Sequence, residues 1–272
     1  MRDLPFNYHD KVWATCPIGD LVFSFNGFTL KYLLEITKKK FNNSPITFLD
    51  IGCGGGKTLL YLQKIRPNWK LWGLDVSKDA ISYTRRKHGR NISFINSSAE
   101  KIPVNDNYFD LIYTSDTLEH LEKLSETISE INRVLKKDGI LFISVPLSNQ
   151  KYTLYPLFKN IGLSQMGKMV GHIRNFDDKE IQKLVKKSGF KFIGRKYCWH
   201  PLFSLVNLGF GYFQLIIGKQ VSFESGVEKS KSEFIKPILT IIKNIFAFVT
   251  YVESSVLFWF PGGKGVYVFQ KK

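Results

Sequence analysis

Cysteine is scarce in this chain, and acidic residues are few. Its 272 residues include three cysteines, Cys16, Cys53 and Cys198, which are widely spaced and form no C-x-x-C pair. An odd number at this spacing argues against a disulfide framework or a zinc site and favours a reducing compartment. Metal-ligand spacing is also missing among the histidines, which stand at positions 9, 88, 120, 172 and 200. We therefore predict no metal centre.

The shortage of acid makes the chain strongly basic. Lysine and arginine number 39 against 23 aspartates and glutamates, which gives a formal net charge of +16. Such a balance serves solubility alone, or it attracts nucleic acid or an anionic membrane surface. The charge by itself does not choose between these. Nucleic acid is the weaker alternative, because the lysines are spread along the chain and no compact aromatic-and-arginine module is present.

The continuous apolar core of a signal peptide is absent near the N-terminus, where Asp3, His9 and Asp10 interrupt the sequence. We therefore expect a cytoplasmic location, either free or peripheral on the cytoplasmic face of a membrane. General disorder is excluded, since 44% of the residues are hydrophobic and 15% are aromatic. The length supports one α/β domain with additions.

The most informative segment that the chain does contain is residues 46–58, ITFLDIGCGGGKT. A short apolar run with β-branched residues enters a glycine cluster, and a helix-compatible segment follows at 59–66. This order predicts a buried strand, a tight turn and a helix whose N-terminus faces a polar ligand. A phosphate-binding P-loop would need glycine in place of Ile51, and a dinucleotide fingerprint would need glycine in place of Lys57.

What remains is the pattern acid-x-G-x-G-x-G, which runs from Asp50 to Gly56. It resembles the first motif of the class I, Rossmann-like methyltransferases that use S-adenosylmethionine (SAM), in particular those acting on small molecules or lipids. Three later segments share this resemblance: Phe-Asp-Leu-Ile at 109–112, Leu-Glu-His-Leu at 118–121 and Leu-Lys-x-Asp-Gly-x-Leu at 135–141. Each is weak alone, but four in this order are specific.

Strand-like and helix-like segments alternate along the chain and predict a doubly wound α/β fold with a mostly parallel sheet. The expected strands are 46–51, 70–75, 91–96, 109–115, 140–145, 190–197 and 265–270. We expect Ser77 to cap the helix after the second strand and residues 136–139 to close the helix before the fifth. The resemblance implies that the last of the seven is antiparallel to the others. We expect an N-terminal helical cap at 1–45, a methyltransferase domain at 46–200 and 262–272, and an apolar helical insertion at 201–261.

Ligands bind such sheets at the carboxyl ends of the strands. Asp75 ends the second strand 23 residues after Gly52, where its carboxylate can accept hydrogen bonds from ribose hydroxyls. A plain turn residue is the alternative. Ser98 replaces the acid that related methyltransferases direct at adenine, and it is an uncharged acceptor. The resemblance implies SAM as cofactor, bound by Asp50, Gly52, Cys53, Gly54, Gly56, Asp75, Val76, Ser98, Ala99, Glu100 and Ser115.

Methyl transfer from SAM is an in-line attack by an acceptor atom and needs no covalent enzyme nucleophile. A hydroxyl acceptor would have to lose a proton. His120 follows the fourth strand and is our first candidate for the general base, although it could instead be a packing or capping residue. His172 and Asp116 are second candidates. His172 and Arg174 belong to the segment GHIRNF at 171–176, for which an ordinary loop is the alternative.

The segment 201–261 differs from the rest in being largely apolar. Residues 201–218 carry no charge, and residues 238–259 are apolar nearly all round a helix except for a narrow polar seam. Lys243 and Glu253 argue against passage through a membrane. Flat insertion into one leaflet accounts for both the charge and the apolar surface, and packing on the chain's own core or in a dimer is the alternative.

These observations predict a SAM-dependent methyltransferase whose acceptor is small or membrane-linked, such as a lipid, a quinone precursor or a lipid-linked saccharide. A nucleic-acid methyltransferase and a non-catalytic SAM-binding or membrane scaffold protein are the alternatives. Lys57 disfavours a nicotinamide oxidoreductase. The sequence selects no oligomeric state.

Overall fold

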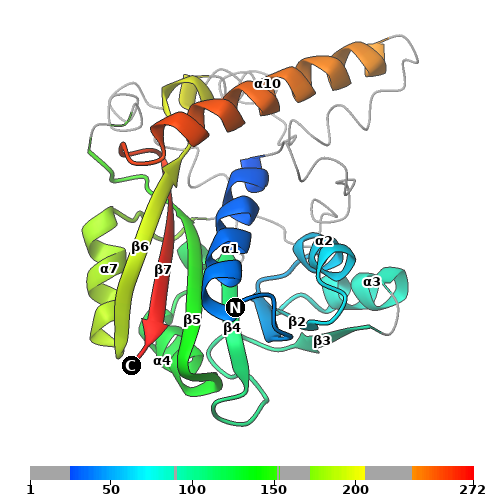
Figure 1. The fold of residues 1–272 in the computed structure, drawn as a ribbon, viewed down its shortest axis with the longest axis vertical. Helices are drawn as coiled ribbons and strands as arrows, with labels where there is room; N and C mark the ends of the chain where they lie inside the picture. Colours follow the sequence, from blue (N-terminus) through cyan, green and yellow to red (C-terminus); the bar gives the residue numbers. More distant parts are fainter. Residues whose placement is uncertain (1–24, 89–90, 152, 154–171, 206–234) are drawn as a thin grey trace.

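Seven segments of the chain pair into one sheet in the order β3-β2-β1-β4-β5-β7-β6 (Figure 1). The computed structural model describes residues 25–88, 91–151, 153, 172–205 and 235–272. The strands are β1 (Thr47–Ile51), β2 (Lys70–Asp75), β3 (Ile92–Asn96), β4 (Phe109–Ser115), β5 (Leu135–Pro146), β6 (Phe190–Cys198) and β7 (Lys264–Lys271). The helices are α1 (Phe25–Phe41), α2 (Lys57–Ile65), α3 (Lys78–His88), the 3-10 turn η3 (Leu118–His120), α4 (Leu124–Val134), α7 (Asp178–Lys187) and α10 (Ile235–Leu257).

The expected sheet is confirmed, including its one reversed strand. The pairs β1–β2, β2–β3, β1–β4 and β4–β5 are parallel, while β7 lies antiparallel between β5 and β6. Its first residue, Lys264, pairs with Pro146 and Cys198, the last residues of its two neighbours. The reversed strand therefore starts at the edge where the parallel strands end, which is the edge that binds ligands in such sheets.

The fifth strand begins earlier than predicted. Residues 136–139 were expected to close the preceding helix, but α4 ends at Val134 and β5 already starts at Leu135. The register with β4 shifts between Phe109 and Leu111, so the extra residues form an irregularity in the ladder. Asp138 takes a left-handed φ of 62° there. Such a bulge inserts residues without breaking the strand, and the sequence pattern mistook it for a turn.

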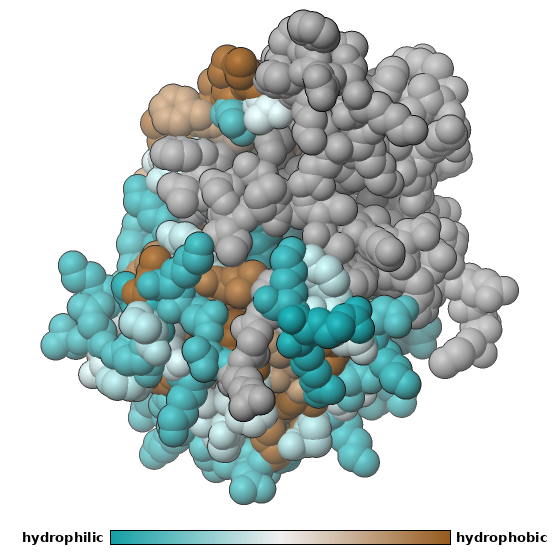
Figure 2. All heavy atoms as spheres, turned by 90° about the vertical axis from the view of Figure 1, so that its right-hand side faces the viewer, coloured by the Kyte–Doolittle hydropathy of each residue, from teal (hydrophilic) through white to brown (hydrophobic). Residues whose placement is uncertain are grey.

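The described half of the expected insertion is α10, which crosses above α1 in Figure 1. Its polarity is inverted: Thr250 and Ser254 are buried, while a row of apolar side chains is exposed. Figure 2 shows apolar side chains at the top of the molecule and, below them, a mostly hydrophilic surface with some apolar patches. No helix within the described ranges is both long and apolar enough to span a membrane. Residues 1–24 and 206–234 of the expected cap and insertion lie outside the described residues.

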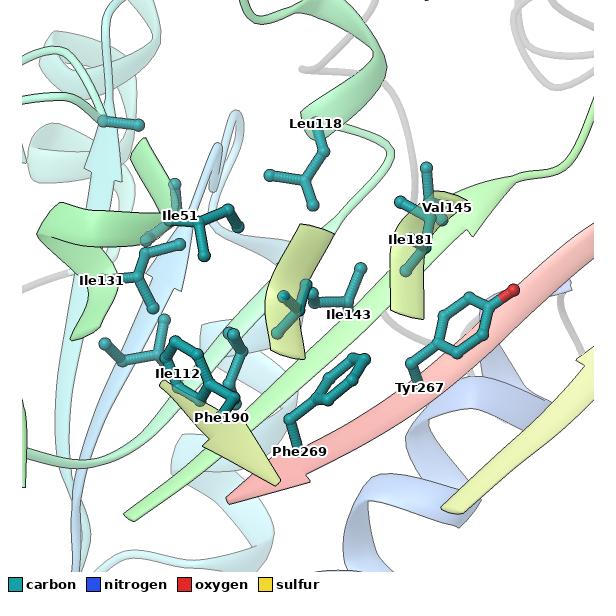
Figure 3. Packing of buried hydrophobic residues seen from close by; sticks show 14 of the residues in the cluster. Ile51, Ile112, Leu118, Ile131, Ile143, Val145, Ile181, Phe190, Tyr267 and Phe269 are labelled. Atoms are coloured by element: carbon teal, nitrogen blue, oxygen red, sulfur yellow. The ribbon is translucent and has the colours of Figure 1, made fainter. Parts of the chain in front are cut away.

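Two apolar layers cover the two faces of the sheet. Alternate residues of each strand point to opposite sides, so Leu49 and Ile51 join the layer with α4 and α7, while Phe48 joins the layer with α1, α2 and α3. Figure 3 shows the first layer, in which Phe190, Tyr267 and Phe269 pack beside the isoleucines of the parallel strands. Burial on both faces fixes the strand register, and with it the position of every strand end.

The helix α7 is fixed at its start by a capping box. Asp177 Oδ1 accepts a hydrogen bond from Glu180 N at 2.9 Å, and Glu180 Oε2 accepts one from Asp177 N at 2.9 Å. The predicted cap of α3 is confirmed in the same way, since Ser77 Oγ accepts from Ala80 N at 3.2 Å. Each cap satisfies backbone N–H groups that have no partner within the helix.

Replacement of Asp177 by alanine should lower the free energy of unfolding by about 1 kcal/mol, because it removes both halves of the capping box. Urea denaturation of the full chain, followed by circular dichroism, measures this difference. Lys179→Ala is the matched control, since Lys179 is exposed on the same helix and should change stability by less than about 0.5 kcal/mol. Equal effects of the two variants would contradict the role of the cap.

Candidate functional site

The glycine turn after β1 is folded against the end of β2. Gly52 N and Cys53 N both donate hydrogen bonds to Leu74 O, at 2.8 and 3.0 Å. Gly52, Gly54 and Gly56 take left-handed φ angles of 77°, 48° and 70°, which side chains rarely adopt. A Cβ on Gly52 would also lie 2.2 Å from Thr117 Oγ1. Both the backbone angle and the space therefore require glycine at this position.

The carboxylate of Asp75 joins this turn to the start of α3. Its Oδ2 accepts from Gly54 N and its Oδ1 accepts from Ser77 N, each at 2.8 Å. Burial raises the pKa of Asp75, and the two N–H donors act in the opposite direction. Each carboxylate oxygen has a further lone pair that a ribose hydroxyl can use. The acid that sequence spacing selected thus lies at the glycine turn.

Two of the other predicted cofactor residues, at the end of β1 and in the turn, are buried. Asp50 is 4% exposed, and burial, with the charge of Asp75, raises its pKa well above the ordinary value. Cys53 is also buried, which raises the pKa of its thiol. Both side chains are buried, and their direct contact with a cofactor stays a prediction.

The end of β3 completes this side of the edge. Asn96 Nδ2 donates to Asp75 O at 3.0 Å and to Val76 O at 2.9 Å, and Ser97 N donates to Asp75 O at 3.2 Å. Val76 is 75% exposed, so an apolar surface stands open beside the Asp75 carboxylate. Sequence reasoning missed Asn96, whose place as the last residue of a predicted strand was the available signal.

The next three predicted residues follow the same strand and differ in burial. Ser98 and Glu100 are half-buried, whereas Ala99 is buried in the apolar core. The loop is closed by hydrogen bonds from Ser97 Oγ to Lys101 O at 2.7 Å and from Lys101 N to Ser98 O at 3.3 Å. The polar side chains of 98 and 100 are therefore the ones available to a ligand.

The end of β4 lies on the other side of the glycine turn. Thr117 Oγ1 lies within hydrogen-bond distance of Ile51 O, at 3.3 Å, and of Ser115 O, at 3.1 Å. This hydroxyl fills the space that a side chain at Gly52 would need. Sequence reasoning did not single out Thr117, although it lies two residues after the predicted strand.

Asp116 was a candidate base, and the structure places it in an ion pair. Lys264 Nζ donates to Asp116 Oδ2 at 2.5 Å, and Ser115 Oγ donates to the same oxygen at 3.1 Å. Lys264 is 1% exposed, and its ammonium lies 4.8 Å from the centroid of the Trp199 ring. Asp116 takes a left-handed φ of 52°. Its carboxylate is thus already engaged with a cation.

The two candidate histidines lie together. The ring centroids of His120 and His172 are 5.1 Å apart, and the rings meet at 67°. Glu119, which sequence reasoning missed, is 1% exposed, and its Oε1 lies 3.8 Å from His172 Nε2. Each of these three side chains offers one atom that could bind a metal ion, and these atoms all lie within 4.8 Å of one another. Sequence spacing gave no sign of such a group, because His172 lies 52 residues after His120.

Backbone and side-chain hydrogen bonds hold His172 in this place. Ile173 N and Arg174 N donate to Glu119 O at 3.0 and 3.2 Å. The Arg174 guanidinium donates to Leu121 O at 3.0 Å and to Glu122 O at 2.5 Å. The segment is therefore attached to the turn after β4, and Arg174 is its anchor. Gly171 of the predicted motif lies outside the described residues.

Burial keeps both partners of this group in their neutral forms. Burial, with the charge of Asp116, raises the pKa of Glu119 to about 8. Burial, with the charge of His120, lowers the pKa of His172 to about 4. Within the described part of the chain, neither Glu119 oxygen nor His172 Nδ1 has a hydrogen-bond partner. The half of the edge beyond the glycine turn is thus a buried cluster of groups that bind protons.

Comparison with protein families identifies the central part of the chain. Residues 49–143 match the family model described as a methyltransferase domain. The chain is 31% identical over 119 residues to a demethylmenaquinone methyltransferase of Chlorobaculum tepidum, covering 42% of this chain and 48% of that protein. It is 32% identical over 131 residues to a ubiquinone biosynthesis O-methyltransferase of Pelagibacter ubique, covering 44% and 53%. The chain spans about half the length of the curated relatives it matches.

Solved structures agree on the fold. A putative sarcosine dimethylglycine methyltransferase from Galdieria sulphuraria superposes with a TM-score of 0.57 at 16% identity, covering 89% of this chain and 84% of that one. A putative methyltransferase from Bacillus halodurans gives a TM-score of 0.56 at 19% identity, covering 89% and 98%. The open edge with its positive-φ glycines and Asp75 also fits an adenosyl ligand. Residues 49–143 therefore match a methyltransferase domain, and the chain has the Rossmann-like fold of the class I methyltransferases, whose cofactor is S-adenosylmethionine.

Proposed function

We propose that this protein transfers a methyl group from SAM to a small or membrane-linked acceptor of the quinone type. The observation that carries the proposal is the Asp75 carboxylate, which is hydrogen-bonded to Gly54 N in the glycine turn and to Ser77 N beyond β2. These contacts are made at the carboxyl edge of a parallel sheet. The relatives named for demethylmenaquinone and ubiquinone biosynthesis support the acceptor class.

The residues of this chain would mainly position and shield the reactants. SAM supplies an activated methyl group when bound, so the protein needs no covalent nucleophile. Alignment of acceptor and methyl group can contribute about 7–11 kcal/mol to the barrier reduction. The carboxyl edge of the sheet offers one place for each reactant. Gly52 to Asp75 would form the cofactor side, and the turn that carries His120 would form the acceptor side. Thr117 packs between the two halves, against Gly52.

The alternatives gain little support. A nucleic-acid substrate rests on the net charge of +16 alone. A non-catalytic SAM-binding role rests on Ser98 alone, and Asp75 keeps the acid that ribose recognition requires. A lipid-linked saccharide remains an acceptor within the same proposal, because it would reach the site from the same membrane surface.

A place at the membrane surface is the second part of the proposal, and the inverted polarity of α10 supports it. The exposed apolar side chains recur every three or four residues and form one stripe of the helix: Ile241, Ile245, Phe248, Val249, Val252, Val256 and, just beyond its end, Trp259. A helix of this kind inserts its apolar face into the boundary between headgroups and acyl chains. The positive net charge would add attraction to anionic lipids.

Glu253, the acidic residue that argued against passage through a membrane, binds backbone N–H groups within the protein. Its carboxylate accepts hydrogen bonds from Leu202 N at 2.9 Å and from Phe203 N at 3.4 Å. Both bonds hold the helical residues 201–205 against α10. The carboxylate is therefore engaged within the protein and does not interrupt the exposed stripe. A small hollow next to residues 201–205 is lined by Trp199 and Phe203 on one side and by Thr250 and Ser254 of α10 on the other, and Lys264 lies near the Trp199 ring.

Replacement of Asp75 by asparagine should weaken SAM binding by roughly 10- to 100-fold, because a charge-assisted hydrogen bond contributes about 1.5–3 kcal/mol. Isothermal titration calorimetry measures the affinity directly. Asp79→Asn is the matched control, since Asp79 is exposed in the first turn of α3. Wild-type affinity in Asp75→Asn, or no SAM binding by the wild type at millimolar concentration, would contradict the proposal.

The reaction itself is tested with methyl-labelled SAM and a total lipid extract. We expect label in the organic phase and a quinone-like acceptor in the labelled fraction, with transfer reduced at least about tenfold in Asp75→Asn, as its binding loss predicts. Added total RNA is the competing substrate. Label that enters RNA and not lipid would reverse the ranking of the acceptors.

The membrane part of the proposal is tested by flotation with phosphatidylcholine vesicles that contain phosphatidylglycerol. The double variant Val252→Glu, Val256→Glu should reduce bound protein by more than about tenfold, since each valine buried in lipid contributes roughly 1.5 kcal/mol or more. Lys179→Glu, on the exposed side of α7, changes the net charge by the same two units and is the matched control. Equal losses would mean that charge alone drives binding, and no binding by the wild type would reject the membrane surface.

A further inference from the structure

The proposed function gives no role to Glu119, a buried acidic side chain. It lies in η3, it is 1% exposed, and both of its carboxyl oxygens are buried without a hydrogen-bond partner in the described part of the chain. No other aspartate or glutamate in the described ranges has both oxygens in this state. Leaving a buried polar group unpaired is unfavourable, and more so for a charged group. Such a cost is characteristic of functional sites.

His172, the neighbour of the Glu119 carboxyl, belongs to a segment that hydrogen bonds hold in place. Glu119 O accepts hydrogen bonds from Ile173 N and Arg174 N, so the residue that presents the carboxyl also anchors the segment that carries His172. The guanidinium of Arg174 fixes the same segment to Leu121 O. As a result Glu119 Oε1 lies 3.8 Å from His172 Nε2, and the other ring nitrogen, Nδ1, is left without a partner.

Three other charged or titratable groups act on this pair. The charge of Asp116 opposes ionisation of Glu119, and the ammonium of Lys264 favours it. His120 packs edge-on against His172 and, with Lys264, disfavours a charge on the His172 ring, whereas Asp116 favours it. Asp116 and Lys264 are joined by their own ion pair, so their charges largely offset each other. The carboxyl of Glu119 is then the nearest group that can balance an imidazolium.

We propose that Glu119 and His172 form the proton-accepting pair for methyl transfer to a hydroxyl-bearing acceptor. This rests on the proposed function and narrows the acceptor atom to an oxygen that must lose a proton. Glu119 is the new element, because sequence reasoning considered only the two histidines and Asp116 as bases. The arrangement follows the general rule that a carboxylate orients the base and stabilises its protonated form.

The acceptor oxygen bonds to the methyl carbon while the carbon–sulfur bond breaks, and the electron pair of that bond stays on sulfur. The hydroxyl proton passes to His172 Nδ1, the nitrogen that faces away from Glu119. The imidazolium that results donates from Nε2 to the Glu119 carboxylate. One positive charge leaves the sulfonium and one appears on the imidazole, beside a compensating negative charge.

The protonation state of Glu119 sets the pH dependence. Its pKa of about 8 means that the carboxyl is neutral at lower pH and cannot balance an imidazolium there. His172, with a pKa of about 4, is neutral over the whole working range. Activity should therefore rise as pH increases through about 8. Glu119, His120 and His172 are also close enough together to hold a divalent cation, but the positive charge of the nearby Lys264 ammonium disfavours one there.

The first test needs no acceptor. In nuclear magnetic resonance spectra of imidazole-labelled protein, His172 should stay neutral down to about pH 5 and show a shift change centred near pH 8 that reports Glu119. Glu119→Gln should abolish that change. A His172 that titrates near its ordinary pKa of about 6.5, or a change near pH 8 that survives Glu119→Gln, would overturn the proposal.

Stability provides a check on Glu119→Gln. A carboxyl whose pKa is raised on folding, from about 4.5 to about 8, favours the folded state fully below pH 4.5, and this contribution is lost as pH rises towards 8. Glutamine does not ionise, so the free energy of unfolding of Glu119→Gln should not fall in this way as pH rises. Its free energy of unfolding should therefore match or exceed the wild-type value at pH 8, and a clearly less stable variant would contradict a buried, neutral carboxyl.

The second test follows label transfer into the lipid extract from pH 6.5 to 9.5. The wild-type rate should rise through about pH 8, whereas Glu119→Gln should show no rise and should be slower by roughly 10²- to 10⁴-fold at pH 9. Its SAM affinity should be unchanged, which separates this proposal from failure of the methyltransferase assignment. Glu122→Gln, an exposed neighbour, should behave as wild type. A Glu119→Gln profile equal to wild type, or transfer that requires an added divalent cation, would overturn the pair.

Discussion

The hydrogen bonds of the Asp75 carboxylate are the interaction on which the cofactor side of this protein depends. They connect the glycine turn after β1 with the loop after β2, at Gly54 N and Ser77 N. The glycines make the contact possible, because their left-handed φ angles direct backbone N–H groups at a neighbouring carboxylate. The end of β3 is added through Asn96, which donates to the backbone of 75 and 76. Hydrogen bonds therefore join three strand ends into one edge of the sheet.

This side of the site could be predicted from the sequence because its signals are local. The pattern from Asp50 to Gly56 and the spacing to Asp75 lie within one β-α-β unit, whose geometry is nearly fixed. The alternation of apolar residues likewise predicted the strands and, with the family resemblance, the reversal of β7. The error at residues 136–139 has the same origin: a Lys-Lys-Asp-Gly run is typical of a turn, and only pairing with β4 shows that it is a bulge.

The acceptor side could not be predicted in this way, because its contacts join residues far apart in the chain. Lys264 meets Asp116 across 148 residues, and only the antiparallel register of β7 brings its first residue to the ligand edge. Glu119 was part of a motif that carried the family resemblance, yet its burial beside His172 depends on the docking of a segment 53 residues later. Pattern reasoning named His120 and His172 but had no means of detecting the carboxyl between the turn and that segment.

The inverted polarity of α10 relates the proposed membrane surface to the proposed proton-accepting pair. In a helix that simply covers a core, Thr250 and Ser254 would face solvent and the valines would be buried. Here the small polar residues lie against the protein, and their hydroxyl groups can be satisfied locally, as when Thr250 Oγ1 donates to Phe246 O at 2.9 Å. The exposed apolar stripe lies on the opposite face of the helix from these hydroxyl groups and can contact lipid there. Trp199 lines a small hollow with Thr250 and Ser254 of α10 and lies beside Lys264, so the helix proposed to lie on lipid is close to the Lys264–Asp116 ion pair. An acceptor with a lipid tail and a hydroxyl head would need this proximity, whereas a freely diffusing acceptor would not.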